Sequence, residues 1–298
     1  MSAPSRLPLT IRPAAPTTSR KLPCQRPQGP FRTDLPAAFG GGSCAVVGSS
    51  DLLRLSPRGA EIDSHSFVWR LNNAPTAGWE AAVGRRTSLR VINHVPIEKW
   101  LLLASNRSAL AATRDGDEYQ RLLCAPGAVE HGCVVSLQSA GRAFATKLEM
   151  YRELYPSHHL SLMSDAMQRF GTRCNSELHG SAPSGGLLTV LLALAVCDSV
   201  SLFGFWPFCC RAHRGWPRMH YKYSQGNRTS WVCCSRGREK MELEFGLYET
   251  FARKRLLNLI VGEPPPSQLE FDASAGAART APRLRLGGLH ISRASRDS

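Results

Sequence analysis

Residues 44–93, CAVVGSSDLLRLSPRGAEIDSHSFVWRLNNAPTAGWEAAVGRRTSLRVIN, hold the pattern that predicts the fold. A short apolar run at 44–47 stops at the small residues 48–50, which is typical of a buried strand entering a turn. Two more strands are predicted at 66–70 and 88–92, and each ends in polar residues. The segments between these strands are long enough for crossovers. An α/β sheet places ligand groups at the carboxyl ends of its strands, so we expect a site there.

The same stretch carries five short motifs: CAVVG at 44–48, EIDSH at 61–65, R-x-N at 70–72, NAPT at 73–76 and VGRRTS at 83–88. Far downstream, PSGG at 183–186 precedes an apolar run and CDSVSLFGF at 197–205. In this order, the two sets resemble the large and small sialylmotifs of the eukaryotic sialyltransferase family. The resemblance covers about residues 43–261. It implies a single-domain α/β fold, in which a Rossmann-like, mostly parallel sheet is flanked by helices as a variant of the GT-A glycosyltransferase fold.

Three regions are expected along the chain. Residues 1–42 are rich in Pro and Arg and are predicted to be disordered, residues 43–262 to form the sialyltransferase-like catalytic domain, and residues 263–298 to form a disordered tail. No apolar run before residue 38 is long enough for a membrane helix or a signal-peptide core. The resemblance nevertheless implies a Golgi protein with an N-terminal membrane anchor. We therefore expect a sequence that starts late or has lost an upstream segment; the literal alternative is a soluble cytosolic form.

The net charge of +14 predicts anionic partners. Nucleic acid, acidic membranes, and a nucleotide sugar or acidic glycan all fit an excess of arginine. No basic run is interleaved with aromatic residues, which disfavours a nucleic-acid module. A basic nucleic-acid-binding protein is kept as an alternative that rests on charge alone.

Ten cysteines fit either a reduced cytosolic protein or a lumenal protein with a few disulfides. The resemblance favours the lumen and implies one disulfide, Cys44–Cys197, between the two motifs. The alternative is two buried thiols that pack as small apolar groups. Two glycosylation sequons, at 106–108 and 227–229, agree with a secretory route, although such triplets also arise by chance.

Two features suggest metal binding, and we discount both. The vicinal pairs Cys209–Cys210 and Cys233–Cys234 lie near histidines, but adjacent cysteines seldom reach one ion and no C-x₂-C spacing is present. The D-x-D at 115–117 does not follow a strand and is predicted to be a solvated loop. The sequence therefore predicts no metal cofactor.

Further elements follow from apolar periodicity. Strands are predicted at 133–137 and 200–205, and helices at 96–103, 143–154, 163–170, 187–196 and 239–259. Ser184 would cap the helix that follows it, leaving backbone N–H groups free to bind an anion. The alternative is a plain helix cap without a ligand.

The resemblance implies transfer of sialic acid from CMP-sialic acid to a glycan hydroxyl, with inversion at the anomeric carbon. The acceptor would be a galactose- or sialic-acid-terminated glycan. The residues at matching motif positions that would bind the donor are Ser49, Asn72, Ser184, Gly185, Gly186 and Gly204.

Such a transfer needs a base for the acceptor hydroxyl and a group that stabilises the leaving phosphate. The family's H-Y-x-[ED] motif, linked to the phosphate, corresponds to residues 220–223, where His220 matches and the acidic residue does not. The alternative role for His220 is purely structural. The family's H-x₄-E motif, which supplies the base, corresponds to Glu239 and Glu244, so a glutamate replaces the usual histidine. Glu239 could act as base only if burial raised its pKa, and a catalytically impaired member that binds nucleotide or glycan is the competing hypothesis.

Overall fold

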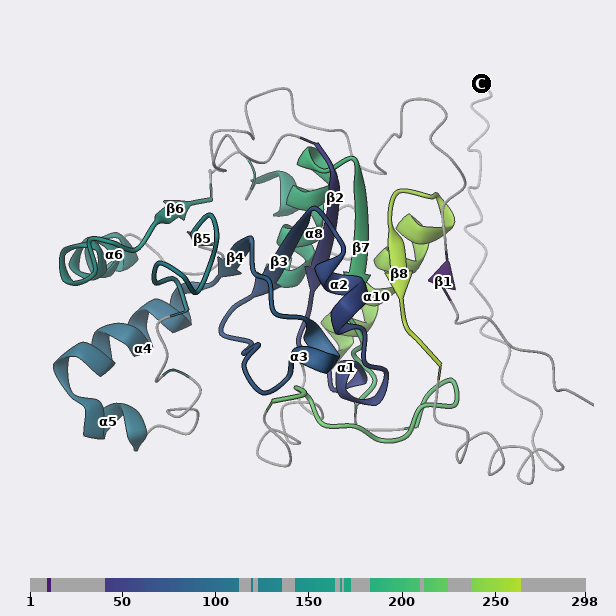
Figure 1. Ribbon diagram of the computed structural model, residues 1–298, viewed down its shortest axis with the longest axis horizontal. Helices are drawn as coiled ribbons and strands as arrows, with labels where there is room; N and C mark the ends of the chain where they lie inside the picture. Colours follow the sequence, from purple (N-terminus) through teal and green to yellow (C-terminus); the bar gives the residue numbers. More distant parts are fainter. Residues whose placement is uncertain are drawn as a thin grey trace, which may run out of the picture.

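An eight-stranded sheet forms the centre of the computed structural model (Figure 1). The structure describes residues 10–11, 41–112, 119, 123–135, 143–163, 167, 169–172, 183–209, 212–224 and 237–263. The strands lie in the order β1-β8-β7-β2-β3-β4-β5-β6. Their bounds are Thr10–Ile11 (β1), Ser43–Val47 (β2), Phe67–Leu71 (β3), Leu89–Ile92 (β4), Cys133–Val135 (β5), Leu160–Leu162 (β6), Ser199–Phe203 (β7) and Asn258–Ile260 (β8). Every neighbouring pair is parallel except β1 with β8, which confirms the predicted mostly parallel sheet.

Strand β2 lies at the middle of the sheet, between β3 and β7. Its residues 44–47 are all buried, as expected for a parallel strand that is covered on both faces. From β2 the chain builds the sheet outward through β3, β4 and β5 to β6, and then returns to β7 on the other side of β2. The strand order therefore reverses between β2 and β7. In open α/β sheets, ligands bind at such a reversal, outside the carboxyl ends of the strands.

Helices cover both faces of the sheet (Figure 1). Their bounds are Leu52–Leu55 (α1), Gly59–Asp63 (α2), Glu80–Val83 (α3), His94–Ser105 (α4), Arg107–Ala111 (α5), Ala143–Leu154 (α6), Gly185–Val196 (α8) and Gly237–Arg253 (α10). Side chains of α8 and α10 pack with Cys44 and Val46 on one face, and side chains of α1, α2 and α3 pack with Ala45 and Val47 on the other. Helices α4 and α6 form a third cluster beside β4 and β5. No helix among the described residues is long and apolar enough to cross a membrane.

Helix α8 is apolar around its whole circumference because it is enclosed by the sheet and its neighbours. Its seven consecutive residues 187–193 are buried. A helix of this kind has no polar face to place in water, so its position is fixed by packing. It brings Ser184, its N-cap residue, to the same edge of the sheet as the end of β2.

Most predicted elements are confirmed. Strands β2, β3 and β4 begin within one residue of the predicted starts, and α6 has the predicted bounds. Strand β7 ends at Phe203 rather than 205, because Gly204 has a φ of 69° that takes the chain out of the extended conformation.

The prediction of one helix over 239–259 is wrong in its last residues. Helix α10 ends at Arg253, Arg255 has a φ of 58°, and the chain then enters β8 beside β7. The apolar residues Leu259 and Ile260 continue the helical spacing, but they are buried as part of a strand. A three-residue strand is too short to show the two-residue period that identifies strands in a sequence.

Two other short strands have no counterpart in the predictions. Edge strand β6 pairs with β5, and two of its three residues are exposed. Strand β1 lies within residues 1–42, which were expected to be disordered, and its register pairs Thr10 with Ile260 and Ile11 with Leu259.

Several predictions fall wholly or partly outside the described residues. They concern residues 1–9, 12–40, 115–117, 136–137, 164–166, 168, 210, 227–229, 233–234 and 264–298. Within the predicted helix at 163–170, Met167, Arg169 and Phe170 are helical, whereas Met163 is not.

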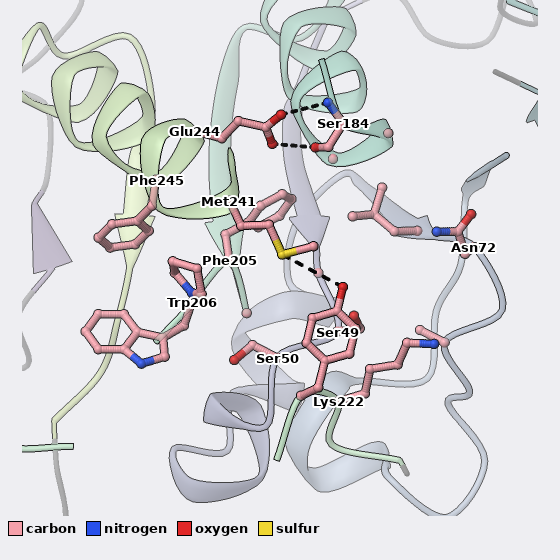
Figure 2. A pocket seen from close by; sticks show the side chains of 18 of the residues that line it. Ser49, Ser50, Asn72, Ser184, Phe205, Trp206, Lys222, Met241, Glu244 and Phe245 are labelled. Atoms are coloured by element: carbon pink, nitrogen blue, oxygen red, sulfur yellow. Dashed lines mark hydrogen bonds between the residues drawn. The ribbon is translucent and has the colours of Figure 1, made fainter. Parts of the chain in front are cut away.

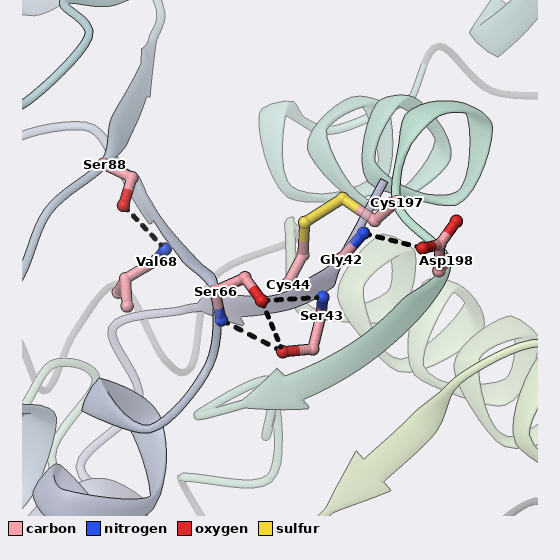
Figure 3. Close-up of a disulfide and its surroundings, with 8 residues drawn as sticks. All are labelled: Gly42, Ser43, Cys44, Ser66, Val68, Ser88, Cys197 and Asp198. Carbon is pink, nitrogen blue, oxygen red and sulfur yellow. Dashed lines mark hydrogen bonds between the residues drawn. A yellow bond between two sulfur atoms is a disulfide. The ribbon is translucent and has the colours of Figure 1, made fainter. Parts of the chain in front are cut away.

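Two disulfides join described cysteines to each other. Cys44 at the start of β2 is bonded to Cys197, directly after α8, across a sequence separation of 153 residues (Figure 3). The predicted pairing is therefore confirmed. A second disulfide, Cys124–Cys133, spans only 9 residues and was not predicted. Near the first disulfide, the Gly42 N–H donates to the Asp198 carboxylate at 2.7 Å, so the two motifs are also joined by a hydrogen bond.

We expect the longer disulfide to stabilise the fold more than the shorter one. By the chain-entropy relation, closing the longer loop lowers the free energy of the folded state relative to the unfolded state by about 5 kcal/mol, against about 2.5 kcal/mol for the shorter loop. The test compares urea unfolding of the Cys44→Ala/Cys197→Ala and Cys124→Ala/Cys133→Ala variants. Equal losses of unfolding free energy would contradict the expectation.

Candidate active site

A pocket of about 380 Å³ opens at the carboxyl ends of β2, β3 and β7, where the strand order reverses. We call it the strand-end pocket (Figure 2). Its walls come from the end of β2, the end of β3, the start of α8, the end of β7, the segment before residue 223, and α10. The lining residues are Gly48, Ser49, Ser50, Leu71, Asn72, Asn73, Ala74, Asn93, Ser184, Gly185, Gly186, Gly204, Phe205, Trp206, Pro207, Tyr221, Lys222, Lys240, Met241, Glu244, Phe245 and Tyr248.

Two glycines allow the ends of β2 and β7 to approach each other. The Gly48 N–H donates to the Phe203 carbonyl at 2.7 Å, and a Cβ on Gly48 would lie 2.4 Å from the Gly204 carbonyl oxygen. Gly204 combines its positive φ with a site where a Cβ would lie 2.5 Å from Leu53. A side chain at Gly48 would push the two strand ends apart, whereas a side chain at Gly204 would collide with Leu53 of α1. Beside its predicted donor-binding role, Gly204 thus has a structural role, which is to leave room for Leu53.

Asn72 presents an amide group to the pocket. Its Oδ1 accepts a hydrogen bond from the Asn93 N–H at 3.0 Å, so its NH₂ group faces away from that contact. Figure 2 shows this nitrogen directed into the strand-end pocket. The residue has a φ of 46°, in the left-handed region that asparagine tolerates better than most residues. Asn72 is therefore held in one orientation as a hydrogen-bond donor.

Ser184 joins the start of α8 to α10. Its Oγ accepts from the Leu187 N–H at 3.1 Å, which confirms the predicted helix cap. The Ser184 N–H and hydroxyl donate to the two carboxylate oxygens of Glu244, at 2.7 and 2.5 Å (Figure 2). The N–H groups of Gly185 and Gly186 have no partner among the described residues, and both glycines line the pocket. They form a place where an anion can bind at a helix N-terminus.

Burial raises the pKa of two side chains on α10. Desolvation raises the pKa of Glu244 above its ordinary value, and the hydrogen bonds from Ser184 only partly oppose this shift. Burial, followed by the nearby Glu244 carboxylate, raises the pKa of Tyr248 well above its ordinary value, so its hydroxyl stays protonated. The Tyr248 hydroxyl and the Trp206 Nε1 are buried donors without a partner among the described residues. Both residues line the pocket.

The segment that contains His220 is anchored beneath the pocket. The His220 N–H donates at 3.1 Å to Asp51, a fully buried carboxylate that also pairs with Arg54. The Tyr223 N–H donates to the Ser49 carbonyl at 3.0 Å. These bonds turn Tyr221 and Lys222 toward the pocket, whereas His220 itself is not among its described lining residues.

The predicted site residues thus fall into three groups. All six predicted donor-binding positions line the strand-end pocket: Ser49, Asn72, Ser184, Gly185, Gly186 and Gly204. His220 lies two residues from the pocket-lining Lys222. Glu239 is in the first turn of α10, immediately before the pocket-lining Lys240, but its side chain is outside the described residues.

Sequence reasoning missed the apolar residues that α10 supplies to the site. Met241, Phe245 and Tyr248 line the pocket at helical spacing. The same spacing is typical of a face that packs into a core, and it was interpreted in that way. Their position beside a Glu that matches a motif was the only available signal.

Comparison with known proteins decides the family. A sequence model of glycosyltransferase family 29 (sialyltransferase) matches residues 32–256. The chain belongs to this family. The expected sialyltransferase resemblance is therefore confirmed.

Two human sialyltransferases illustrate the similarity of this family 29 member to its relatives. One is the alpha-N-acetyl-neuraminyl-2,3-beta-galactosyl-1,3-N-acetyl-galactosaminide alpha-2,6-sialyltransferase, 32% identical over 193 residues, which are 62% of this chain and 60% of the relative. The other is CMP-N-acetylneuraminate-beta-galactosamide-alpha-2,3-sialyltransferase 1, 34% identical over 164 residues, which are 54% of this chain and 44% of the relative. The chain thus spans about half of the length of these relatives.

A solved structure supports the fold. The crystal structure of a mammalian sialyltransferase superimposes with a TM-score of 0.50 at 23% identity, covering 75% of this chain and 70% of that chain. At this identity, the match shows the sheet architecture that the two proteins share.

The raised pKa of Glu244 predicts a pH dependence of stability. The folded state binds a proton at Glu244 more tightly than the unfolded state does, so the wild type loses stability as the pH rises from the ordinary glutamate pKa through the raised one. Relative to Glu244→Gln, we expect the wild type to lose unfolding free energy across this window. Urea unfolding at several pH values measures it.

The glutamine variant also changes the hydrogen bonds to Ser184. This effect shifts the free energy of unfolding by the same amount at every pH and does not change its slope against pH. Glu153→Gln, at an exposed position on α6, is the matched control. Its free energy of unfolding should change with pH in parallel with that of the wild type. If the free energy of unfolding of Glu244→Gln also changed with pH in parallel with that of the wild type, the pKa of the Glu244 carboxyl group would not be raised by folding.

Proposed function

We propose that this chain is an inverting sialyltransferase, which transfers sialic acid from CMP-sialic acid to a hydroxyl group of a glycan. One observation carries the proposal in a chain of this family: the two sialylmotifs meet at the strand-end pocket, where the chain places Asn72 opposite the free N–H groups of Gly185 and Gly186. These groups are suited to a nucleotide phosphate.

The pocket is suited to an anionic donor. Lys222 and Lys240 are among its lining residues, and Glu244, its only described lining carboxylate, is bonded to Ser184. The Asn72 amide and the start of α8 add hydrogen-bond donors without adding charge. Donors fixed before the ligand binds stabilise the developing charge of a leaving phosphate without having to reorganise.

The transfer forms one bond and breaks one. The acceptor oxygen attacks the anomeric carbon of sialic acid, the bond from that carbon to the phosphate oxygen breaks, and CMP leaves with the electron pair. A base takes the proton of the acceptor hydroxyl. We assign this role to Glu239 and the stabilisation of the phosphate to His220, with Lys222 beside it. No metal is required for a monophosphate leaving group.

The acceptor would lie against the aromatic side of the pocket. Phe205, Trp206, Phe245 and Tyr248 form that wall, with Trp206 and Phe245 in edge contact. Aromatic faces pack against sugar rings, and the unpaired Trp206 and Tyr248 donors can bind sugar hydroxyls. The names of the two human relatives point to galactose- or sialic-acid-terminated glycans. Such acceptors place the reaction in the Golgi lumen, which also suits the disulfides.

A second candidate function is binding without transfer. The replacement of the usual histidine by Glu239 favours it, because an ordinary carboxylate is a weaker base than imidazole near neutral pH. The two candidates share the strand-end pocket and differ only in turnover.

One pair of measurements tests both candidates. Calorimetry with CMP measures binding, and labelled CMP-sialic acid with desialylated or sialylated glycoprotein measures transfer. Binding together with transfer supports the enzyme, and binding without transfer supports the impaired member. Absence of both would overturn both candidates, and salt-sensitive binding to random DNA without an effect of CMP would favour a nucleic-acid-binding protein.

Asn72→Asp tests the donor site. Aspartate keeps the acceptor for the Asn93 N–H, but it turns a carboxylate oxygen, rather than an NH₂ group, toward the phosphate. The loss of a hydrogen bond to a charged group, about 1.5–3 kcal/mol, predicts that CMP binds at least 10-fold more weakly. Exposed Asn106→Asp, with the same change of charge, should leave CMP affinity unchanged. Equal affinities of Asn72→Asp and wild type would exclude Asn72 from the donor site.

Glu239 is tested by two substitutions with opposite expectations. Glu239→His should increase transfer, since it restores imidazole as the base. Glu239→Gln should reduce transfer by a factor of about 10² or more while leaving CMP affinity intact, because it removes the base without altering the pocket. If neither variant changes the rate, Glu239 has no part in the reaction.

A further inference from the structure

Two arginines are buried side by side behind one wall of the strand-end pocket. Arg70 on β3 and Arg90 on β4 are partners in the parallel register, so their side chains project from the same face of the sheet. Each residue is only 1% exposed. Arginine is almost never buried to this extent without a charged partner.

Neither guanidinium group forms an ion pair with a carboxylate among the described residues. Arg70 donates to the carbonyl oxygens of Val83 and Arg86 and to the Thr87 hydroxyl. Arg90 donates through Nη1 to the carbonyl oxygens of Asn72 and Ala74, at 2.6 and 3.1 Å. Arg70 Nη1 and Arg90 Nε have no hydrogen-bond partner in the described part of the chain. Uncompensated buried charges destabilise a protein, so their presence calls for a compensating role.

Both side chains remain charged at neutral pH. Burial lowers the pKa of Arg70 to about 10 and, together with the neighbouring Arg70 charge, that of Arg90 to about 9. Two positive charges therefore lie in a poorly hydrated region, where electrostatic interactions are screened far less than at the surface.

The bonds of Arg90 connect this charge to the pocket. Asn72 and Ala74, whose carbonyls it holds, both line the strand-end pocket. Because these carbonyl oxygens bond to the buried guanidinium, they are not the groups that the loop offers to a ligand. The same contact holds Asn72 in its left-handed conformation, with its NH₂ group toward the pocket.

We propose that Arg90, with Arg70 beside it, is a positioning residue that makes the strand-end pocket selective for the phosphate of the nucleotide. Its charge attracts the anion through the Asn72–Ala74 wall, while its hydrogen bonds fix that wall. The inference rests on the proposed use of a CMP-linked donor. It assigns selectivity to a buried pair of cations that the ligand does not touch.

The ratio of CMP affinity to cytidine affinity isolates the phosphate, since the two ligands differ in nothing else. Calorimetry would give this ratio for the wild type, for Arg90→Lys and for Arg90→Gln. Lysine keeps the charge, whereas glutamine keeps a hydrogen-bond donor and loses the charge. We expect Arg90→Gln to lower the ratio 10-fold or more and Arg90→Lys to lower it less than 3-fold. Arg253→Gln, at the exposed end of α10, has the same change of net charge and should leave the ratio unchanged.

Equal reductions of the affinity ratio in the lysine and glutamine variants would overturn the proposal, because they would show that Arg90 acts through its hydrogen bonds alone and not through its charge. An unchanged ratio in both would also overturn it, although the proposed function would stand as long as the wild type binds CMP. If the wild type showed no binding of CMP, the proposed function itself would fail.

A further measurement leaves Arg90 unchanged, so its result does not depend on whether an Arg90 variant folds. Lys222→Met/Lys240→Met removes the cations that line the pocket. With this variant, we expect the preference for CMP over cytidine to be lower than in the wild type but still at least 10-fold in both 0.05 M and 0.5 M salt, because buried charges are poorly screened. Loss of the preference in this variant would assign selectivity to the lysines and overturn the proposal.

Discussion

The close approach of the ends of β2 and β7 is the constraint on which the site depends. Gly48 has no side chain to separate the two strands, and its N–H donates to the Phe203 carbonyl. The strand order reverses at the same place, so the helices that follow β2 and precede β7 lie on opposite faces of the sheet. The result is a crevice in which the strand ends supply backbone atoms at the base and the surrounding elements supply side chains that can contact a ligand.

Three interactions, or tethers, hold the elements around that crevice in fixed positions relative to one another. The disulfide between Cys44 and Cys197 joins β2 to the end of α8, and the Ser184–Glu244 pair joins the start of α8 to α10. A third tether, from Tyr223 to the Ser49 carbonyl, brings Lys222 under the pocket. The ligand-facing groups are therefore held by bonds that they make on their other side. This arrangement is what preorganised binding of an anion requires, because the donors need not move when the charge arrives.

Much of this architecture could be predicted from the sequence, for reasons that differ between elements. The apolar runs of β2 and β7 are buried on both faces, so both strands were visible in the sequence, although the end of β7 was predicted two residues too late. Asn72, Ser184 and the paired cysteines stood in motifs of a family to which the chain belongs. Strand β8 was not recognised, because its residues Leu259 and Ile260 continue the apolar spacing of α10. Met241, Phe245 and Tyr248 were hidden because a pocket wall and a core face have the same period.

The sequence by itself determined where the first strands of the sheet lie and which serine caps the long helix. Only the tertiary structure decided that Arg70 and Arg90 lie side by side near Asn72, with no carboxylate between them among the described residues. It also decided that both carboxylate oxygens of Glu244 accept hydrogen bonds from Ser184. The physical reason is that local propensity acts over a few neighbours along the chain. Burial and charge compensation depend instead on residues brought together from distant parts of it, and so they exist only once the sheet has formed.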